Sequence, residues 1–306
     1  MDTIGNNKPR VSVFINTRNR AKLIPRALNS LSRQTFCDYE VVILDADSTD
    51  ETELVIKNYI KKDKRIRYIK YNNEKLATCL NYLISKCSGE YITQLDDDDE
   101  YYPEKIQKQV HLLDNSPKKV GVVYCWEEFW DDRSDTKLYN NKPSVRGDAY
   151  LKLLEKSCVG GGTTMMMRKS ACDFVGGLDE SIKLAADYQL NINLSKHYNH
   201  DFVPEVLVRT HINHNYNRLT DMKVPIMQHA DMIEYIEKIL HDHKDAFDQY
   251  PHLRFNHYRS IMHSAAKNRD FATFVKYLKL GFALTDSFQE KLLYSSRGIK
   301  HFILSK

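Results

Sequence analysis

The sequence predicts an α/β protein with an open, doubly wound, mostly parallel sheet flanked by helices, followed by a C-terminal helical segment. Two observations support this fold class. Short apolar runs rich in β-branched residues alternate with amphipathic stretches over residues 11–95, the order expected of a parallel sheet with helical crossovers. From Pro225 onward the apolar residues recur only with the period of a helix.

Strands and helices alternate from the start of the chain. The expected strands cover residues 11–15, 41–44, 66–71 and 91–95, and the expected helices between them cover 21–34, 50–62 and 76–86. The second strand is apolar throughout, which is typical of the middle of a parallel sheet, because both faces are covered there. Farther along, the pattern predicts strands over 120–124 and 163–167 and a helix over 188–197.

The composition narrows the class of protein. Hydrophobic residues make up 42% and charged residues 28%, and the net charge is only +4, so we expect a soluble globular protein without a nucleic-acid partner. The N-terminus lacks a signal-peptide layout, and no apolar run approaches the roughly 20 residues that span a bilayer. The six cysteines show no C-x-x-C spacing, which favours buried free thiols in a reducing cytoplasm.

Four consecutive aspartates, residues 96–99, directly follow the expected strand 91–95. Carboxylates packed so closely repel one another unless a cation neutralises them. A divalent metal is the obvious cation, because hard cations prefer carboxylate oxygens and often keep a bound phosphate as a further ligand. A solvated acidic turn is the plain alternative. The strand before the run and the Pro103 turn into a helix after it favour the metal site.

Polar residues also follow the first two strands. They occupy positions 16–19 and 45–48, and ligands of open α/β sheets bind beyond these carboxyl ends. The sequence has neither a G-x-G-x-x-G after the first strand nor a G-x-x-x-x-G-K-[ST] motif, which argues against a dinucleotide oxidoreductase and a P-loop enzyme. The remaining hypothesis is a nucleotide site in which carboxylates and a metal hold the nucleotide.

Taken in order, these stretches resemble the family 2 glycosyltransferases, which have the GT-A fold. The matching segments are 11–20, 32–36, 40–50, 89–92, 95–99, 103–105 and 176–180, followed by Asp187. The resemblance implies a nucleotide-sugar-binding half over residues 1–120 and an acceptor-binding and catalytic half of the same domain over 121–222. The C-terminal helical segment, 223–306, matches no family pattern.

The resemblance also implies a set of donor-binding residues. Thr17 and Asp45 would line the base pocket, and Asp96 would face the ribose. Asp98 would ligate Mn²⁺ or Mg²⁺ bridging the diphosphate of UDP, and His211 falls where many members place a histidine near the diphosphate or metal. The further expected nucleotide-sugar contacts are Asn16, Arg18, Lys75 and Asp97.

Some positions depart from the family pattern. Asn16 stands where proline is usual, and Arg18 where an aromatic residue is common. Ala46 replaces a second aspartate, so uracil contacts shift to Asp45. Lys75 replaces a glycine, and its ammonium can reach a phosphate.

Asp187 falls where inverting members of the family keep their general base. A single in-line displacement needs one carboxylate that removes the proton of the acceptor hydroxyl, and it predicts inversion at the anomeric carbon. Double displacement would need a second carboxylate as nucleophile, and the sequence singles none out. Because Asp187 directly precedes the helix expected over 188–197, an N-cap role is the alternative.

The end of the chain is basic and aromatic. Between Lys276 and Lys306 six Lys and Arg residues stand against Asp286 and Glu290, with apolar residues interleaved. Such a segment could rest on an anionic leaflet near a lipid-linked acceptor, or it could be a packing or dimer helix. The first alternative predicts a protein at the inner face of the cell membrane.

The sequence and the resemblance together predict an inverting, metal-dependent hexosyl- or N-acetylhexosaminyltransferase. It would move a sugar from a UDP-sugar to a hydroxyl of a glycan or lipid-linked glycan in surface-polysaccharide assembly, of capsule, O-antigen or teichoic-acid type. A sugar nucleotidyltransferase is one rival, and it would normally show a Gly-rich N-terminal loop. A non-catalytic nucleotide-sugar-binding scaffold is the other, and it would be expected to have lost Asp98 or Asp187.

Overall fold

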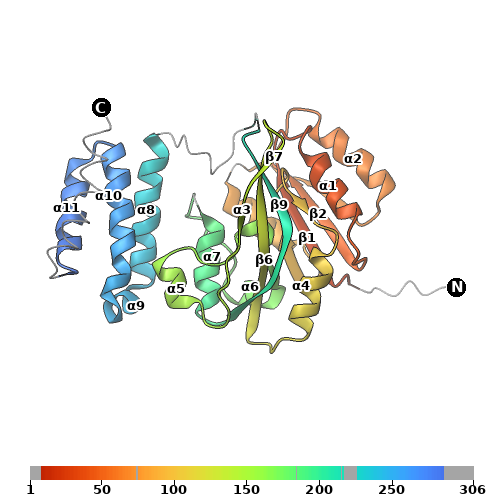
Figure 1. Cartoon of the computed structure of the whole chain (residues 1–306). Helices are drawn as coiled ribbons and strands as arrows, with labels where there is room; N and C mark the ends of the chain where they lie inside the picture. The colour runs from red at the N-terminus through yellow and green to blue at the C-terminus, as the bar shows by residue number, and fades with distance from the viewer. Residues whose placement is uncertain (1–7, 74, 184, 215, 217–225, 286–306) are drawn as a thin grey trace. The chain divides into compact units, whose positions relative to one another are not determined.

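The computed structural model describes residues 8–73, 75–183, 185–214, 216 and 226–285 (Figure 1). The chain forms two compact units. The first comprises residues 1–150, 158–181 and 186–215, and the second comprises 151–157, 182–185 and 216–306.

The first unit contains a nine-stranded sheet in the order β3-β2-β1-β4-β8-β6-β9-β5, with β7 paired to β6. The strands are β1 (Val11–Thr17), β2 (Tyr39–Asp45), β3 (Ile66–Lys70), β4 (Tyr91–Gln94), β5 (Glu100–Tyr101), β6 (Val120–Asp131), β7 (Thr136–Asn141), β8 (Met166–Arg168) and β9 (Asn199–Ile212). The first four strands are mutually parallel, and β6 runs parallel to β9. Antiparallel pairs join β8 to β4 and β6, and β5 to β9. The predicted α/β fold class is confirmed.

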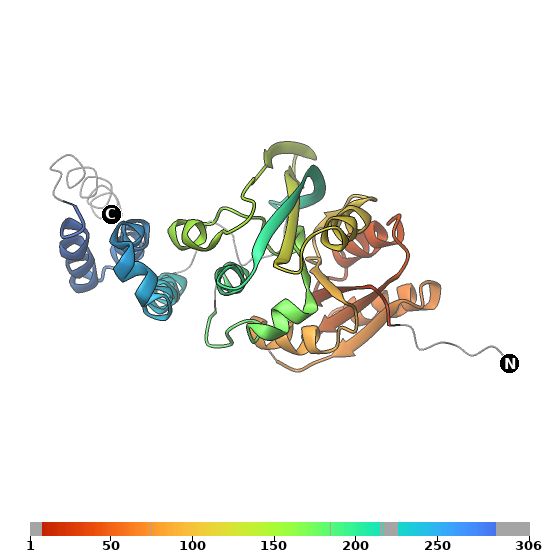
Figure 2. The ribbon, with the colours of Figure 1, turned by 90° about the horizontal axis from the view of Figure 1, so that it is seen from below.

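Helices cover both faces of this sheet (Figure 2). They are α1 (Ile24–Ser32), α2 (Thr52–Lys62), α3 (Leu76–Ser85), α4 (Lys105–Asp114), α6 (Lys169–Phe174) and α7 (Ala186–Ser195). On one face Val11, Val13 and Ile15 of β1 share a buried cluster with apolar residues of α1, α2 and α4. Because side chains of a strand alternate between faces, Phe14 points to the other face, which α3 covers.

Two polar side chains, Ser30 of α1 and Gln34 just after this helix, fix the segment that follows the aspartate run. Ser30 Oγ accepts a hydrogen bond from the Tyr101 amide, and Gln34 Nε2 donates to the Tyr102 carbonyl. Gln34 Oε1 also accepts from the Ile106 amide at the start of α4. The short strand β5 is therefore held between α1 and β9, so the aspartate run is anchored at both of its ends.

Two predicted strands differ from the structure. The strand predicted over 163–167 is wrong at its start, because Thr164 Oγ1 bonds the Gly161 carbonyl and closes a 3₁₀ turn over Gly162–Thr164. Only Met166–Arg168 is a strand. The strand predicted over 120–124 continues to Asp131, and its polar outer half forms a hairpin with β7.

The second unit is helical in its described part, as predicted from Pro225 onward. It contains α8 (Ile226–Asp242), α9 (Lys244–Gln249), α10 (Arg254–Lys267) and α11 (Phe271–Phe282), and also most of α5 (Tyr150–Glu155). Ile236 and Ile239 of α8 are buried, together with Ile261 of α10 and Phe274 of α11. Of the basic C-terminal stretch, residues 286–306 lie outside the described residues. None of the described helices is both long and apolar enough to cross a bilayer.

All six cysteines are free thiols, as expected. Four of them are buried, Cys158 is half-buried and Cys37 is exposed. The expectation of burial therefore fails for Cys37, which follows α1 in the polar turn that leads to β2.

Candidate active site

Thr17 and Asp45 lie side by side at the carboxyl ends of β1 and β2, where the register pairs them directly. Asp45 is fully buried, and its carboxylate accepts hydrogen bonds from the Ser48 amide and the Tyr68 hydroxyl, each at 2.8 Å. Among the described residues, Asn16 Oδ1 is a buried oxygen without a hydrogen-bond partner. A buried acceptor without a donor is costly, so this oxygen suits the N–H or O–H group of a ligand.

The first two aspartates of the run contact the end of β4 and the end of the neighbouring strand β1. Asp96 Oδ1 accepts a hydrogen bond from Gln94 Nε2 at 2.6 Å. Asp97 Oδ2 accepts one from Thr17 Oγ1, also at 2.6 Å, and Arg20 Nε lies 3.9 Å from its other oxygen. The structure therefore brings together Thr17 and Asp97, which are both predicted donor-site residues.

The last two aspartates contact the end of β9 and the residues after it. Asp98 Oδ2 lies 2.9 Å from Nε2 of His214, and both side chains are almost completely buried. Asp99 accepts hydrogen bonds from the His211 amide at 3.0 Å and, more weakly, from the Thr210 hydroxyl at 3.4 Å. Asp99 is thus an anchor to β9, and Asp98 is the carboxylate with an imidazole beside it.

The negative charge of the four aspartates favours a bound cation. Burial, reinforced by the negative charges of Asp98 and Asp96, raises the pKa of Asp97 to about 7. A carboxyl group with such a pKa lacks a full complement of positive charge around it. Within the described ranges, no three His, Cys, Asp or Glu side chains already converge as a metal cluster. The donors at hand, carboxylate oxygen and imidazole nitrogen, fit Mn²⁺ or Mg²⁺ with diphosphate oxygens completing the coordination.

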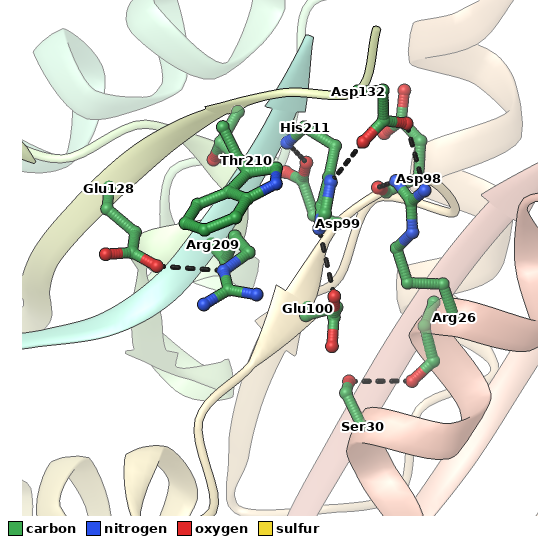
Figure 3. A network of polar contacts seen from close by, with 12 residues as sticks. Arg26, Ser30, Asp98, Asp99, Glu100, Glu128, Asp132, Arg209, Thr210 and His211 are labelled. Atoms are coloured by element: carbon green, nitrogen blue, oxygen red, sulfur yellow. Dashed lines mark hydrogen bonds and ion pairs between the residues drawn. The ribbon is translucent and has the colours of Figure 1, made fainter. Parts of the chain in front are cut away.

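The imidazole of His211 contacts two other carboxylates of the polar network around the aspartate run (Figure 3). Its Nδ1 is 2.6 Å from Asp132 Oδ1, and its Nε2 is 2.9 Å from Glu100 Oε1. The hydrogen bond with His211 lowers the pKa of Glu100. The role of His211 as a metal ligand stays a prediction. Because both ring nitrogens of His211 contact other carboxylates, His214 is the better candidate for a ligand beside Asp98.

Lys75 and Arg18 are exposed residues that lie outside the strands themselves. Lys75 is the N-cap residue of α3, where its amide bonds Asn73 Oδ1. Its exposed side chain stands at a helix N-terminus, which is a favourable position for a phosphate. Arg18 directly follows β1 and is exposed. Their contacts with a nucleotide sugar stay predictions.

Asp187 lies inside the first turn of α7 rather than at its N-cap. Its Oδ2 accepts a hydrogen bond from the Gly162 amide at 3.3 Å, so the carboxylate faces the glycine stretch from another part of the chain. A Cβ atom on Gly161 would stand 3.5 Å from the same oxygen. The glycine backbone therefore lies close against this carboxylate.

Three residues of the site were not singled out from the sequence. One is His214, which follows His211 in an H-x-x-H spacing that places both near the end of β9. Arg26 and Asp132 were not identified, and their contact joins residues 106 positions apart. A single sequence shows no sign of such a long-range pair.

Comparison with known proteins places this geometry in context. Residues 12–176 match the family model described as glycosyl transferase family 2. An uncharacterised glycosyltransferase of Rickettsia typhi is 32% identical over 209 residues, which cover 67% of this chain and 64% of the relative. The putative colanic acid biosynthesis glycosyl transferase WcaA of Escherichia coli K12 is 28% identical, over 79% of this chain and 84% of its own length. The chain thus spans a little under two thirds of the Rickettsia relative.

Solved structures with the same fold carry donors. S. aureus TarS in complex with UDP-GlcNAc superposes with a TM-score of 0.68 at 16% identity, covering 97% of this chain and 90% of that chain. The mannosyltransferase PcManGT from Pyrobaculum calidifontis, in complex with GDP-Man and Mn²⁺, gives a TM-score of 0.61 at 17% identity, covering 98% and 86%. At these identities the likeness shows the fold alone.

Proposed function

The chain belongs to glycosyltransferase family 2 and has the GT-A fold, and on that basis we propose that it is an inverting, metal-dependent glycosyltransferase that uses a UDP-sugar. The observation that carries the proposal is the pair formed by Asp98 and His214, 2.9 Å apart at the carboxyl end of the parallel strands. A carboxylate and an imidazole there suit a divalent cation that holds a diphosphate.

The donor side of the reaction follows from the strand ends. Asn16 and Asp45 offer buried oxygens to the N–H and O–H groups of uridine, and Thr17 steadies Asp97 beside them. Asp98 and His214 would hold Mn²⁺ or Mg²⁺, which as a Lewis acid would stabilise the charge that develops on the leaving UDP. UDP-GlcNAc on TarS and GDP-Man with Mn²⁺ on PcManGT support a nucleotide-sugar donor and a metal.

Asp187 supplies the second half of the chemistry. Its carboxylate would accept the proton of the acceptor hydroxyl while that oxygen attacks the anomeric carbon and the bond to UDP breaks. The Gly162 amide fixes one carboxylate oxygen by its hydrogen bond, so the other can be directed at the acceptor. One displacement of this kind inverts the anomeric configuration.

The two rival functions have less support. A nucleotidyltransferase would normally carry a Gly-rich loop after β1, where this chain has Arg18, Asn19 and Arg20. A scaffold without turnover would not need Asp187, whose carboxylate is held next to the glycine stretch.

For the acceptor and the cellular setting, the proposal names only a class of molecule and a location. WcaA, named for colanic acid biosynthesis, matches over most of both chains, which supports a hydroxyl of a glycan or lipid-linked glycan in surface-polysaccharide assembly. A cytoplasmic enzyme at the inner face of the membrane would meet such an acceptor.

The metal assignment is tested by Asp98→Asn, which keeps the shape of the side chain but removes its charge. We expect Mn²⁺-dependent release of UDP from a UDP-sugar to fall by about 10²-fold or more, because the cation loses an anionic ligand. Asp38→Asn, at an exposed aspartate before β2, is the matched control and should turn over normally. Wild-type turnover by Asp98→Asn would refute the assignment.

A further inference from the structure

We propose that Arg26 and Asp132 form a positioning pair that holds the main chain of Asp98 in the orientation needed for metal-dependent donor binding. Arg26, on α1, donates from one guanidinium nitrogen to the Asp98 carbonyl at 3.1 Å. From the other it donates to Asp132 Oδ2 at 2.9 Å. Figure 3 shows the guanidinium between these two groups. The inference rests on the proposed function, since it concerns the residue that would bind the metal.

Asp132 is itself held from the opposite side. Its second oxygen, Oδ1, lies 2.6 Å from His211 Nδ1, while His211 Nε2 contacts Glu100. The chain of contacts therefore joins α1, the end of β6, β9 and β5 around the aspartate run.

This arrangement acts on Asp98 through its peptide group. The hydrogen bond from Arg26 fixes the direction of the Asp98 carbonyl and therefore the main-chain conformation of Asp98. That conformation in turn determines how the Asp98 carboxylate is directed toward His214. The side chains of Arg26 and Asp132 are only 26% and 14% exposed, so solvent screens the pair less than a surface ion pair. Residues behind metal ligands commonly tune metal affinity in this way.

The pair needs an arginine in particular. A guanidinium presents its donors in a rigid planar fork, whereas a lysine ammonium is a point charge on a flexible stem. Arg26→Lys keeps the charge but cannot span the Asp98 carbonyl and Asp132 with fixed geometry. Both guanidinium ends already have partners, so Arg26 is a positioning residue rather than a catalytic one.

The chain offers a matched control at the other end of the sheet. Arg67 likewise joins a carboxylate to a carbonyl, since it donates to Glu40 Oε2 at 2.6 Å and to the Lys86 carbonyl at 3.1 Å. Arg67→Lys makes the same chemical change far from the strand ends that bind the donor. It measures the purely structural cost of the substitution.

The experiment measures UDP binding by calorimetry with and without Mn²⁺, alongside thermal denaturation, for Arg26→Lys, Asp132→Asn, the double variant and Arg67→Lys. We expect each of the first two to weaken Mn²⁺-dependent UDP binding by about 10-fold or more, with Tm close to that of Arg67→Lys. The double variant should lose little more than either single one, because the two residues act as a unit.

Several outcomes would overturn the inference. Unchanged Mn²⁺-dependent binding in Arg26→Lys and Asp132→Asn would refute it directly. An equal loss of UDP affinity without metal would make Arg26 a direct diphosphate ligand instead, and full additivity in the double variant would remove the coupling. If the wild type binds UDP no better with Mn²⁺ than without, the proposed function itself fails, and this inference fails with it.

Discussion

Lys105, the first residue of α4, is fully buried beneath the strand that leads into the aspartate run. Its Nζ donates to Thr93 Oγ1 at 3.0 Å and to Gln109 Oε1 at 2.9 Å, and it lies 3.8 Å from the centroid of the Tyr101 ring. Burial lowers the pKa of Lys105 to about 7, because removal from water disfavours the charged ammonium.

This buried lysine predicts a pH dependence of stability. In the unfolded chain its pKa returns to about 10.4, so above neutral pH the unfolded state holds a proton that the folded state has released. Stability should therefore rise with pH on account of Lys105, by about 2 kcal/mol between pH 7 and pH 9. In urea denaturation, Lys105→Met should lack this rise.

A second lysine of α4 provides the control. Lys108 pairs with Glu205 and Glu104, and these hydrogen bonds raise its pKa, so Lys108→Met should keep the rise in stability. The same pH dependence in Lys105→Met and the wild type would contradict the burial argument.

Asp187→Asn tests the proposed base directly. An amide still accepts the Gly162 hydrogen bond but cannot take up the acceptor proton, so kcat should fall by about 10² or more while UDP-sugar binding stays unchanged. The measurement is steady-state turnover beside calorimetric donor binding. Asp179→Asn, at a half-buried aspartate of the preceding turn, is the control. Normal turnover by Asp187→Asn would remove this residue from the mechanism.

Residues at strand ends could be predicted from the sequence, because an apolar run followed by polar residues marks the end of a strand. Thr17 and Asp45 lie at the ends of β1 and β2, and Asp98 lies shortly after β4, as that pattern predicts. Arg26 and Asp132 could not be predicted, since their roles arise only when α1 and the end of β6 are brought together by the fold.

At the scale of elements, the side chain of Asn81 on α3 holds the main chain of the turn after α6. Asn81 donates from Nδ2 to the Leu178 carbonyl at 2.8 Å and accepts from the Leu178 amide at 2.9 Å. The turn itself needs two glycines with positive φ, Gly176 at +81° and Gly177 at +74°. A Cβ atom on Gly177 would stand 2.6 Å from Asn81 Oδ1, while one on Gly176 would meet no atom of the described residues within 4 Å.

Substitutions at the two adjacent glycines distinguish the cost of backbone strain from the cost of a clash with Asn81. Gly176→Ala should cost about 1 kcal/mol from backbone strain alone. Gly177→Ala should cost about 1–2 kcal/mol more, because Asn81 must leave its hydrogen bonds with Leu178. Urea denaturation measures both values.

A third substitution tests the cause of that difference. In an Asn81→Ala background, the cost of Gly177→Ala should drop to that of Gly176→Ala. If the extra cost persisted in that background, Asn81 would not be its source.

The elements that could be predicted from the sequence are those in which apolar residues recur with the period of either a strand or a helix. The alternating strands and helices up to β4 were predicted within a few residues, and the chain from Pro225 onward was predicted to be helical without bounds for its single helices. The stretch before β8 was not, because its local Thr164 to Gly161 hydrogen bond competes with the β-branched character of the residues. The hairpin half of β6 was missed because its polar side chains find partners in the fold, as buried Glu128 does in Arg209 and Tyr102.

At the scale of the whole molecule, the C-terminal unit bears on the membrane proposal. On α11, Phe271 is 62% exposed and Leu280 is 39% exposed, and Lys276 and Lys279 belong to the same helix. Apolar and basic side chains together are the combination that binds anionic lipid surfaces.

Sedimentation with anionic vesicles tests this proposal. Lys279→Glu with Phe271→Ser should lower the pelleted fraction of the full chain severalfold, since both the charge and the apolar contact are lost. Lys57→Glu, on α2, makes the same charge change and should pellet like the wild type. Equal pelleting of all three proteins would argue for a packing or dimer role instead.

The anchoring of the aspartate run also determines where the chain can change in length. The peptide between β4 and β5 is tied to Thr17, to His214 and to the main chain of His211, so one inserted or deleted residue there would misalign every later contact. The β6–β7 hairpin begins beside Asp132, and its outer strand is almost entirely exposed. Insertions in a library aimed at new acceptors should be tolerated in the hairpin and eliminated in the aspartate run.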